Sequence, residues 1–188
     1  MCIMAPDGNF NQFDIIDDFN DEYESQARDF PTTYSPRLPK GLNLGRQIYW
    51  LQRKYGDAFS RCTHVLTYPQ YWSWRLSAKA VGEVTSLGCH TDLWDPLLGR
   101  YSQLVRGLGW DRYFPKIKPA WESIGMLKKE IASATGLPEN CEVINGIHDS
   151  NAAYLYHRLG REKPFMVIST GTWFVCMASA GSLERLDE

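Results

Sequence analysis

The sequence predicts an α/β fold on the basis of two stretches near its end. Residues 143–147 form a short apolar run typical of a strand. A helix is predicted directly after it, with Gly160 as its stop. That helix is supported by apolar residues at helical spacing: Ala152, Leu155, Tyr156 and Leu159. Residues 165–169 and 174–178 are apolar runs joined by a Ser-Thr-Gly-Thr-Trp turn, which predicts a hairpin.

Earlier in the chain, four more helices are predicted from the spacing of apolar residues. They cover residues 43–55, 69–76, 101–108 and 124–134, and Gly56 and Gly136 follow the first and the last. Residues 84–94 mix polar and apolar side chains without helical period, which favours a loop or an irregular strand.

The first 38 residues favour hairpin and loop. A turn is predicted at residues 6–9 and a strand at 13–16, followed by an acidic stretch at 17–24 and several prolines. The charged connector at residues 161–164 is the predicted domain boundary.

Composition and charge exclude several classes of protein. The chain has 188 residues, of which 44% are hydrophobic, and a net charge of −2, so nothing favours nucleic acid or anionic lipid as a partner. No apolar run reaches the ~18 residues of a membrane span. The five cysteines are odd in number and never in a C-x-x-C pair, which argues against a disulfide framework. Reduced thiols fit a cytoplasmic protein.

Asp149 is the first candidate for chemistry. It follows the predicted strand at 143–147, and open α/β sheets usually keep their ligand sites at the carboxyl ends of strands. The alternative is that Asp149 or Ser150 only caps the following helix by accepting a backbone N–H.

Two further polar clusters stand out, at residues 86–92 and 169–172. In the second, small residues around a glycine would let backbone N–H groups approach an anion while threonine hydroxyls donate as well. An ordinary hairpin turn could have the same composition. Taken together, Asp149 and this turn predict phosphoryl transfer, with Asp149 accepting the proton of an attacking hydroxyl and the turn holding nucleotide phosphates.

Two alternatives remain open at this point. A metal-dependent hydrolase could use His90, Asp92, His148 and Asp149, although no H-x-x-x-H or H-E-x-x-H spacing supports it. A non-catalytic sugar-binding domain could use some of the seven Trp and ten Tyr for stacking, although most of these lie on apolar faces like core residues.

Four segments in order resemble the FGGY carbohydrate kinases. Residues 145–153 and 168–173 look like two consecutive signatures of that family, most similar to its rhamnulokinase and L-fuculokinase branch. Residues 68–77 resemble the family's P-x-Y-x-x-W-R-L-S/T-G helix, and residues 85–95 resemble the segment that reaches the sugar pocket. The similarity extends from about residue 36 to about residue 180.

The resemblance implies an actin-like, ribonuclease-H-like ATPase fold that binds a sugar and ATP between two domains. Residues 1–160 would be part of the N-terminal sugar-binding domain, and residues 165–188 the start of the C-terminal ATP-binding domain. Asp149 falls at the position of the family's catalytic base. The implied sugar contacts are His90, Thr91 and His148, and the implied phosphate contacts are Thr170, Gly171 and Thr172. Mg²⁺ would enter with ATP through phosphate oxygens and water, without a metal-ligand motif.

The sequence also departs from the family pattern. It lacks the opening D-x-G-T/S turn and a second glycine-rich motif for adenosine, Ala78 stands where the family usually has glycine, and His90 stands where many relatives have Arg or Gly. We therefore expect an internal piece of a kinase that leaves sheet edges and apolar helix faces uncovered. On its own, this piece is expected to have no useful turnover.

Overall fold

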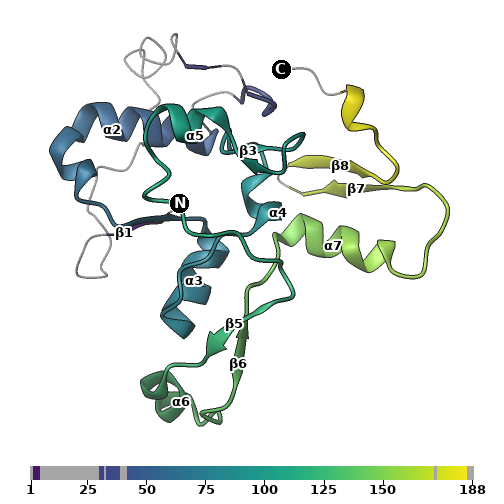
Figure 1. The fold of residues 1–188 in the computed structure, drawn as a ribbon. Coiled ribbons are helices and arrows are strands. Elements are labelled where there is room, and N and C mark those ends of the chain that lie inside the picture. Colours follow the sequence, from purple (N-terminus) through teal and green to yellow (C-terminus); the bar gives the residue numbers. More distant parts are fainter. Residues whose placement is uncertain (1, 5–29, 32, 39–41, 172, 186–188) are drawn as a thin grey trace.

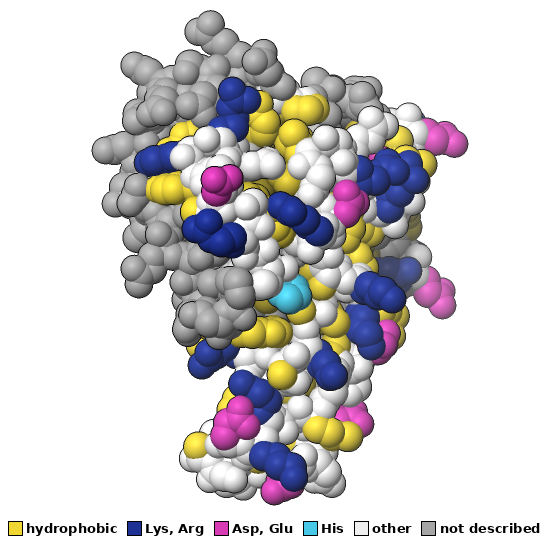
Figure 2. Space-filling view, turned by 60° about the vertical axis from the view of Figure 1, so that its left-hand side comes forward, with side chains coloured by type: hydrophobic (Ala, Val, Ile, Leu, Met, Phe, Trp, Pro, Cys, Tyr) yellow, Lys and Arg dark blue, Asp and Glu magenta, His cyan; other side chains and the backbone are white. Residues whose placement is uncertain are grey.

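The computed structural model describes residues 2–4, 30–31, 33–38, 42–171 and 173–185. The turn at 6–9, the strand at 13–16 and the acidic stretch at 17–24 lie outside the described residues. Within the described part, no helix combines the length and the apolar character needed to cross a membrane. On the face seen in Figure 2, basic and acidic side chains are scattered among one another and form no single charged patch.

The main core lies between helix α2 (Leu44–Ser60), helix α5 (Gln103–Gly107) and the segment that follows α5. Its fully buried side chains include Ile48, Phe59, Leu93, Val105 and Trp110. The helices predicted at 43–55 and 101–108 are both present, but α2 continues past Gly56. Gly56 has φ 38°, a conformation open to glycine, so the helix kinks there and resumes. The extra turn brings Phe59 into the core.

Helix α3 (Tyr68–Ser77) confirms the helix predicted at 69–76. It follows strand β2 (His64–Leu66), which pairs antiparallel with strand β1 (Cys2–Met4). The helix ends at Ala78, whose φ of 59° is in the left-handed region that favours glycine. The departure from the family's usual glycine therefore falls at a position where glycine would be less strained.

The prediction for residues 84–94 was wrong at its start. Residues Val84–Leu87 form the short helix α4, because the Glu83 carboxylate caps it by accepting the N–H groups of Thr85 and Ser86. One helical turn is too short to produce a period in the sequence. Strand β3 (Trp94–Asp95) then pairs with strand β4 (Arg100–Tyr101).

The helix predicted at 124–134 is confirmed in its second half and was wrong in its first. Strand β5 (Ser123–Met126) comes first and pairs antiparallel with strand β6 (Glu142–Ile144), and helix α6 (Lys129–Thr135) follows and ends at Gly136. Ile124 and Leu127 pack with Ala132 of α6 in one small core. A strand and a helix that contribute to the same core can thus imitate a helical period.

The predicted helix and hairpin at the end of the chain are confirmed. Helix α7 (Asp149–Arg158) leads to strands β7 (Met166–Thr170) and β8 (Phe174–Ala178), which pair antiparallel, and a short 3₁₀ helix, η3 (Leu183–Arg185), follows. None of the residues of α7 is buried. The apolar face predicted for α7 is exposed, including Leu155, Tyr156 and Leu159. This agrees with the expectation of uncovered helix faces.

Every named sheet in the described part of the chain is an antiparallel pair of strands. Strand β6 therefore does not end at the edge of an open parallel sheet, and the predicted position of Asp149 at such an edge was wrong. Residues 145–148 extend beyond β6 and carry the chain to the start of α7. Figure 1 shows this start close to α4 and to the ends of β7 and β8.

Candidate functional site

A cavity of about 560 Å³ lies where α4 and the loop after it, the start of α7 and strand β8 meet. The loop contributes Cys89 and His90, strand β3 contributes Trp94, and α7 with its preceding residue contributes His148 and Asp149. The hairpin contributes Trp173 from its turn and Val175 and Met177 from β8, and these last two alternate along the strand and so share one face of it. Three segments distant in sequence thus form one candidate site.

Asp149 is the first residue of α7, and its side chain is 91% exposed. Its Oδ1 accepts the Ser150 N–H at 2.6 Å and lies 3.3 Å from His148 Nδ1. The capping position itself belongs to His148, not to Asp149 or Ser150, and carries no side-chain cap. A carboxylate at the first turn interacts favourably with the helix dipole, and here it also faces a cavity.

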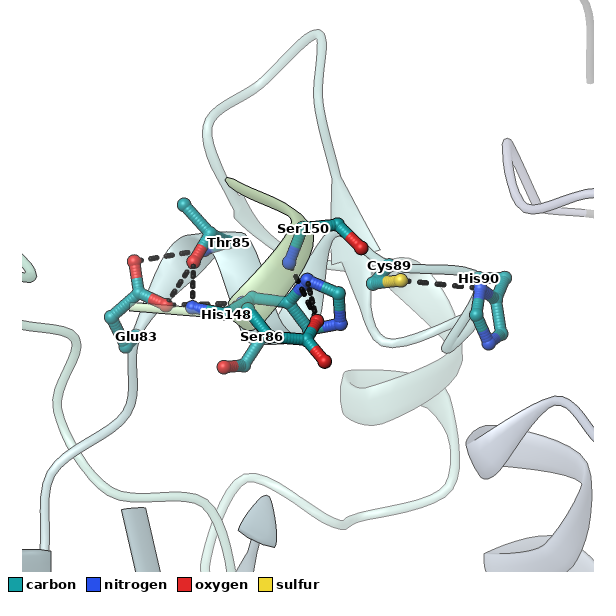
Figure 3. A network of polar contacts seen from close by, with 8 residues as sticks. Glu83, Thr85, Ser86, Cys89, His90, His148 and Ser150 are labelled. Carbon is teal, nitrogen blue, oxygen red and sulfur yellow. Dashed lines mark hydrogen bonds and ion pairs between the residues drawn. The ribbon is translucent and has the colours of Figure 1, made fainter. Parts of the chain in front are cut away.

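His148 joins α7 to the wall of the cavity formed by α4. Its backbone N–H donates to Thr85 Oγ1 at 3.0 Å, while its ring is only partly exposed. Figure 3 shows Thr85 between His148 and Glu83, with its hydroxyl in contact with both.

Cys89 and His90 form the wall opposite these residues. The Cys89 Sγ lies 3.2 Å from His90 Nδ1 (Figure 3). Burial, and secondly the negative charge of Asp149, raise the pKa of the Cys89 thiol. Burial, and secondly the charge of His148, lower the pKa of His90. These effects link the two walls electrostatically and favour the uncharged forms of Cys89 and His90.

Thr91 does not line this cavity. Its hydroxyl is buried, donates to the Leu87 carbonyl and accepts the Leu93 N–H at 3.1 Å. These bonds stabilise the loop after α4 from within. The expectation that Thr91 contacts a sugar gains no support from this position.

Asp92 is also buried and lies outside the cavity lining. Its Oδ1 accepts a hydrogen bond from Thr33 at 2.6 Å, and its N–H donates to Ser35. Burial raises the pKa of Asp92, while the Thr33 hydrogen bond and the Arg46 charge act in the opposite direction. The four residues suggested for a metal-dependent hydrolase are therefore not brought together. Within the described ranges, no three His, Cys, Asp or Glu side chains are grouped so as to hold a metal ion.

The turn between β7 and β8 has open space around it. Beyond Gly171 and the residues next to it in the chain, no atom lies within 4 Å of a Cβ placed on Gly171, and Thr170 is exposed. The Gly171 N–H donates to the Trp173 carbonyl at 3.2 Å, so this donor is used within the turn. Thr172 lies outside the described residues. A ligand has room to approach this turn.

Sequence reasoning missed Glu83, Thr85 and the hairpin residues of the cavity. An acidic residue just before a short polar segment is a capping signal that could have indicated Glu83. The alternation of Trp173, Val175 and Met177 could have indicated one common face, but not what it faces.

The comparisons with known proteins agree with one another. Residues 40–155 match the model of the N-terminal domain of the FGGY family of carbohydrate kinases. L-fuculokinase of Escherichia coli (strain K12) is 26% identical over 144 residues, which are 76% of this chain and 30% of that protein. Rhamnulokinase of Halalkalibacterium halodurans is 27% identical over 140 residues, covering 70% and 28% of the two chains.

The similar solved structures are also carbohydrate kinases. The crystal structure of a carbohydrate kinase from Novosphingobium aromaticivorans has a TM-score of 0.73 and 45% identity, and the match covers 84% of this chain and 35% of that one. A xylulose kinase from Rhodospirillum rubrum shares the fold with a TM-score of 0.67 at 18% identity, over 85% of this chain and 35% of its own. The chain thus spans about a third of the length of the relatives it matches.

Proposed function

Because this chain belongs to the FGGY family of carbohydrate kinases, we propose that it is part of an enzyme that transfers the γ-phosphoryl group of ATP to a small sugar. One observation carries the proposal. The exposed Asp149 carboxylate lines the cavity that α4, α7 and the β7–β8 hairpin form together. Such a group is placed to take a proton from a bound hydroxyl.

In the proposed reaction, a sugar hydroxyl oxygen attacks the γ-phosphorus while the bond from that phosphorus to the ADP oxygen breaks. Asp149 takes the hydroxyl proton, and the products are a sugar phosphate and ADP. His148 and His90 would lie beside the sugar, since both line the same cavity. The hydroxyl and the phosphate must be held in line, so most of the catalytic effect would come from positioning.

ATP is proposed to bind with its phosphates at the turn between β7 and β8, on Thr170, Gly171 and Thr172. The open space at Gly171 supports this placement for the described part of the turn. Mg²⁺ would neutralise charge on the phosphates and be held largely by phosphate oxygens and water. Residues 1–160 would then belong to the sugar-binding domain and residues 165–188 would begin the ATP-binding domain.

The proposed substrate is a pentose, a 6-deoxyhexose or the ketose form of such a sugar. The support is the similarity to proteins named L-fuculokinase and rhamnulokinase. The cavity suits a molecule with both polar and apolar edges, because His90 and His148 line it together with Trp94 and Trp173. A cytoplasmic location is proposed with this function, since the cysteines described by the structure are free thiols.

The test is a panel of pentoses and 6-deoxyhexoses, offered with ATP and Mg²⁺ to the complete gene product that contains these residues. We expect sugar-dependent ADP formation with at least one sugar, and a phosphate ester in the product by ³¹P NMR. Sugar binding without ADP formation would favour a non-catalytic sugar-binding domain. Hydrolytic activity that needs tightly bound zinc or manganese would contradict the proposal.

The 188 residues alone are proposed to have no useful turnover, because they span only about a third of the relatives' length and in-line transfer needs phosphates held from both domains. Sugar-dependent ADP release by the isolated chain above ~1 per second, the low end for kinases, would contradict this.

A further inference from the structure

Thr85 makes a hydrogen bond that connects two distant parts of the chain. Its Oγ1 accepts the backbone N–H of His148 at 3.0 Å, across 63 positions of sequence. His148 is the capping residue of α7, and Asp149 is the next residue. Figure 3 shows the Thr85 hydroxyl directed at this N–H from α4. The bond therefore acts one residue away from the proposed base.

Glu83 fixes the orientation of the Thr85 hydroxyl. The Glu83 side chain is fully buried, and its Oε2 accepts the hydroxyl proton of Thr85 at 2.5 Å. Its carboxylate also accepts the backbone N–H groups of Thr85 and Ser86 at 2.9 and 3.0 Å. A hydroxyl has one proton to donate, so with this proton held by Glu83 its lone pairs remain free to accept from His148.

The start of α7 has few other restraints. No residue of α7 is buried, and His148 has no side-chain cap. Among the described residues, the bond to Thr85 is the only hydrogen bond that joins His148 or Asp149 to a residue outside the beginning of α7. Packing of α7 itself therefore contributes little to the position of the Asp149 carboxylate, so the partly buried His148 and its bond to Thr85 contribute more.

We propose that Thr85, oriented by Glu83, is a positioning residue that holds the start of α7 and thereby sets the place of the Asp149 carboxylate in the cavity. This inference rests on the proposed function. Thr85 itself transfers no proton to or from the sugar.

The test compares three variants of the complete gene product with the unchanged protein. Thr85→Val keeps the shape of the side chain but removes the hydroxyl, and Thr85→Ser keeps the hydroxyl. Ser86→Ala is the matched control, because the Ser86 hydroxyl is also buried in α4 and has no hydrogen-bond partner in the described structure. The measurements are kcat, KM for ATP, the folded fraction, and hydrogen exchange at the His148 amide.

We expect Thr85→Val to lower kcat roughly tenfold to a hundredfold, with KM for ATP changed less than about twofold, since misplacement by about 1 Å can cost that much. The His148 amide should lose protection in the same variant. Thr85→Ser should keep at least about half of kcat, and Ser86→Ala should match the unchanged protein.

The possible failures can be told apart. If the unchanged protein phosphorylates no sugar, the result contradicts both the proposed function and this inference. If a sugar is phosphorylated and folded Thr85→Val keeps more than half of kcat, only the inference falls. It also falls if activity declines only in proportion to the folded fraction. Should Thr85→Val not fold, Thr85→Ala is the second variant, and if that also fails to fold, Thr85 is a structural residue and the positioning role is overturned.

Discussion

The two walls of the cavity are stabilised in different ways. The wall that carries Cys89, His90 and Trp94 belongs to the region packed around the main core, where Leu93 and Ile48 are fully buried. The wall that carries Asp149 begins a helix with no buried residue, followed by a hairpin whose apolar side chains are largely exposed. The proposed catalytic base therefore lies on the less packed of the two walls.

This difference indicates how the site is organised. On the first wall, the buried Leu87 and Leu93 hold the loop that carries Cys89 and His90, because close packing leaves the backbone few alternative positions. On the second wall, a small number of hydrogen bonds holds the backbone in place. These are mainly the bonds of Thr85 and of Asn145, which lies just before α7. Substitutions should consequently affect folding on the first wall and positioning on the second.

The largest difference is expected between two aliphatic truncations. Ile48→Ala in α2 should lower the free energy of unfolding by about 2–5 kcal/mol, as buried large-to-small changes do. Leu155→Ala in α7, whose side chain is 45% exposed, should change it by less than about 1 kcal/mol. Urea unfolding of both variants measures the two values. Equal losses would mean that α7 is packed as firmly as the core.

A smaller effect is expected at Asn145, just before α7. Its buried side-chain amide donates to the carbonyls of Lys118 at 2.8 Å and Gly82 at 3.2 Å. Asn145→Ala would leave these carbonyls without that donor, so the free energy of unfolding should fall by about 1–3 kcal/mol. Asn140→Ala, at an exposed position, is the control and should stay within about 0.5 kcal/mol. A negligible loss at Asn145 would show that water replaces the amide.

The fold class was predictable because most elements have a local signal. The comparisons confirm an α/β chain of the FGGY family, which covers part of that actin-like ATPase fold. The predictions failed where local pattern and tertiary structure disagree. At Gly56 the helix kinks but continues, because residues beyond the glycine pack into the core. At 124–134 a strand and a helix contribute apolar residues to the same small core. Neither outcome is determined by residues close in sequence.

The candidate site was predictable only in part. His90, His148 and Asp149 were identified from the sequence and line one cavity, but Thr91 and Asp92 are neighbours of His90 and lie outside its lining. His90 and Asp92 both have positive φ, so the backbone there turns in a way that sequence spacing does not indicate. The contact of Thr85 with His148 joins residues 63 positions apart and has no sequence signal of its own.

The most direct test of the account is kcat of Asp149→Asn in the complete gene product, measured beside the unchanged protein with the sugar that it phosphorylates. Because the Asp149 side chain is 91% exposed, the variant should fold normally, and kcat should fall at least ~100-fold through loss of the proton acceptor. A variant that is less stable but keeps full activity per folded molecule would contradict the role of Asp149 as the general base. In that case Asp149 would only stabilise the start of α7.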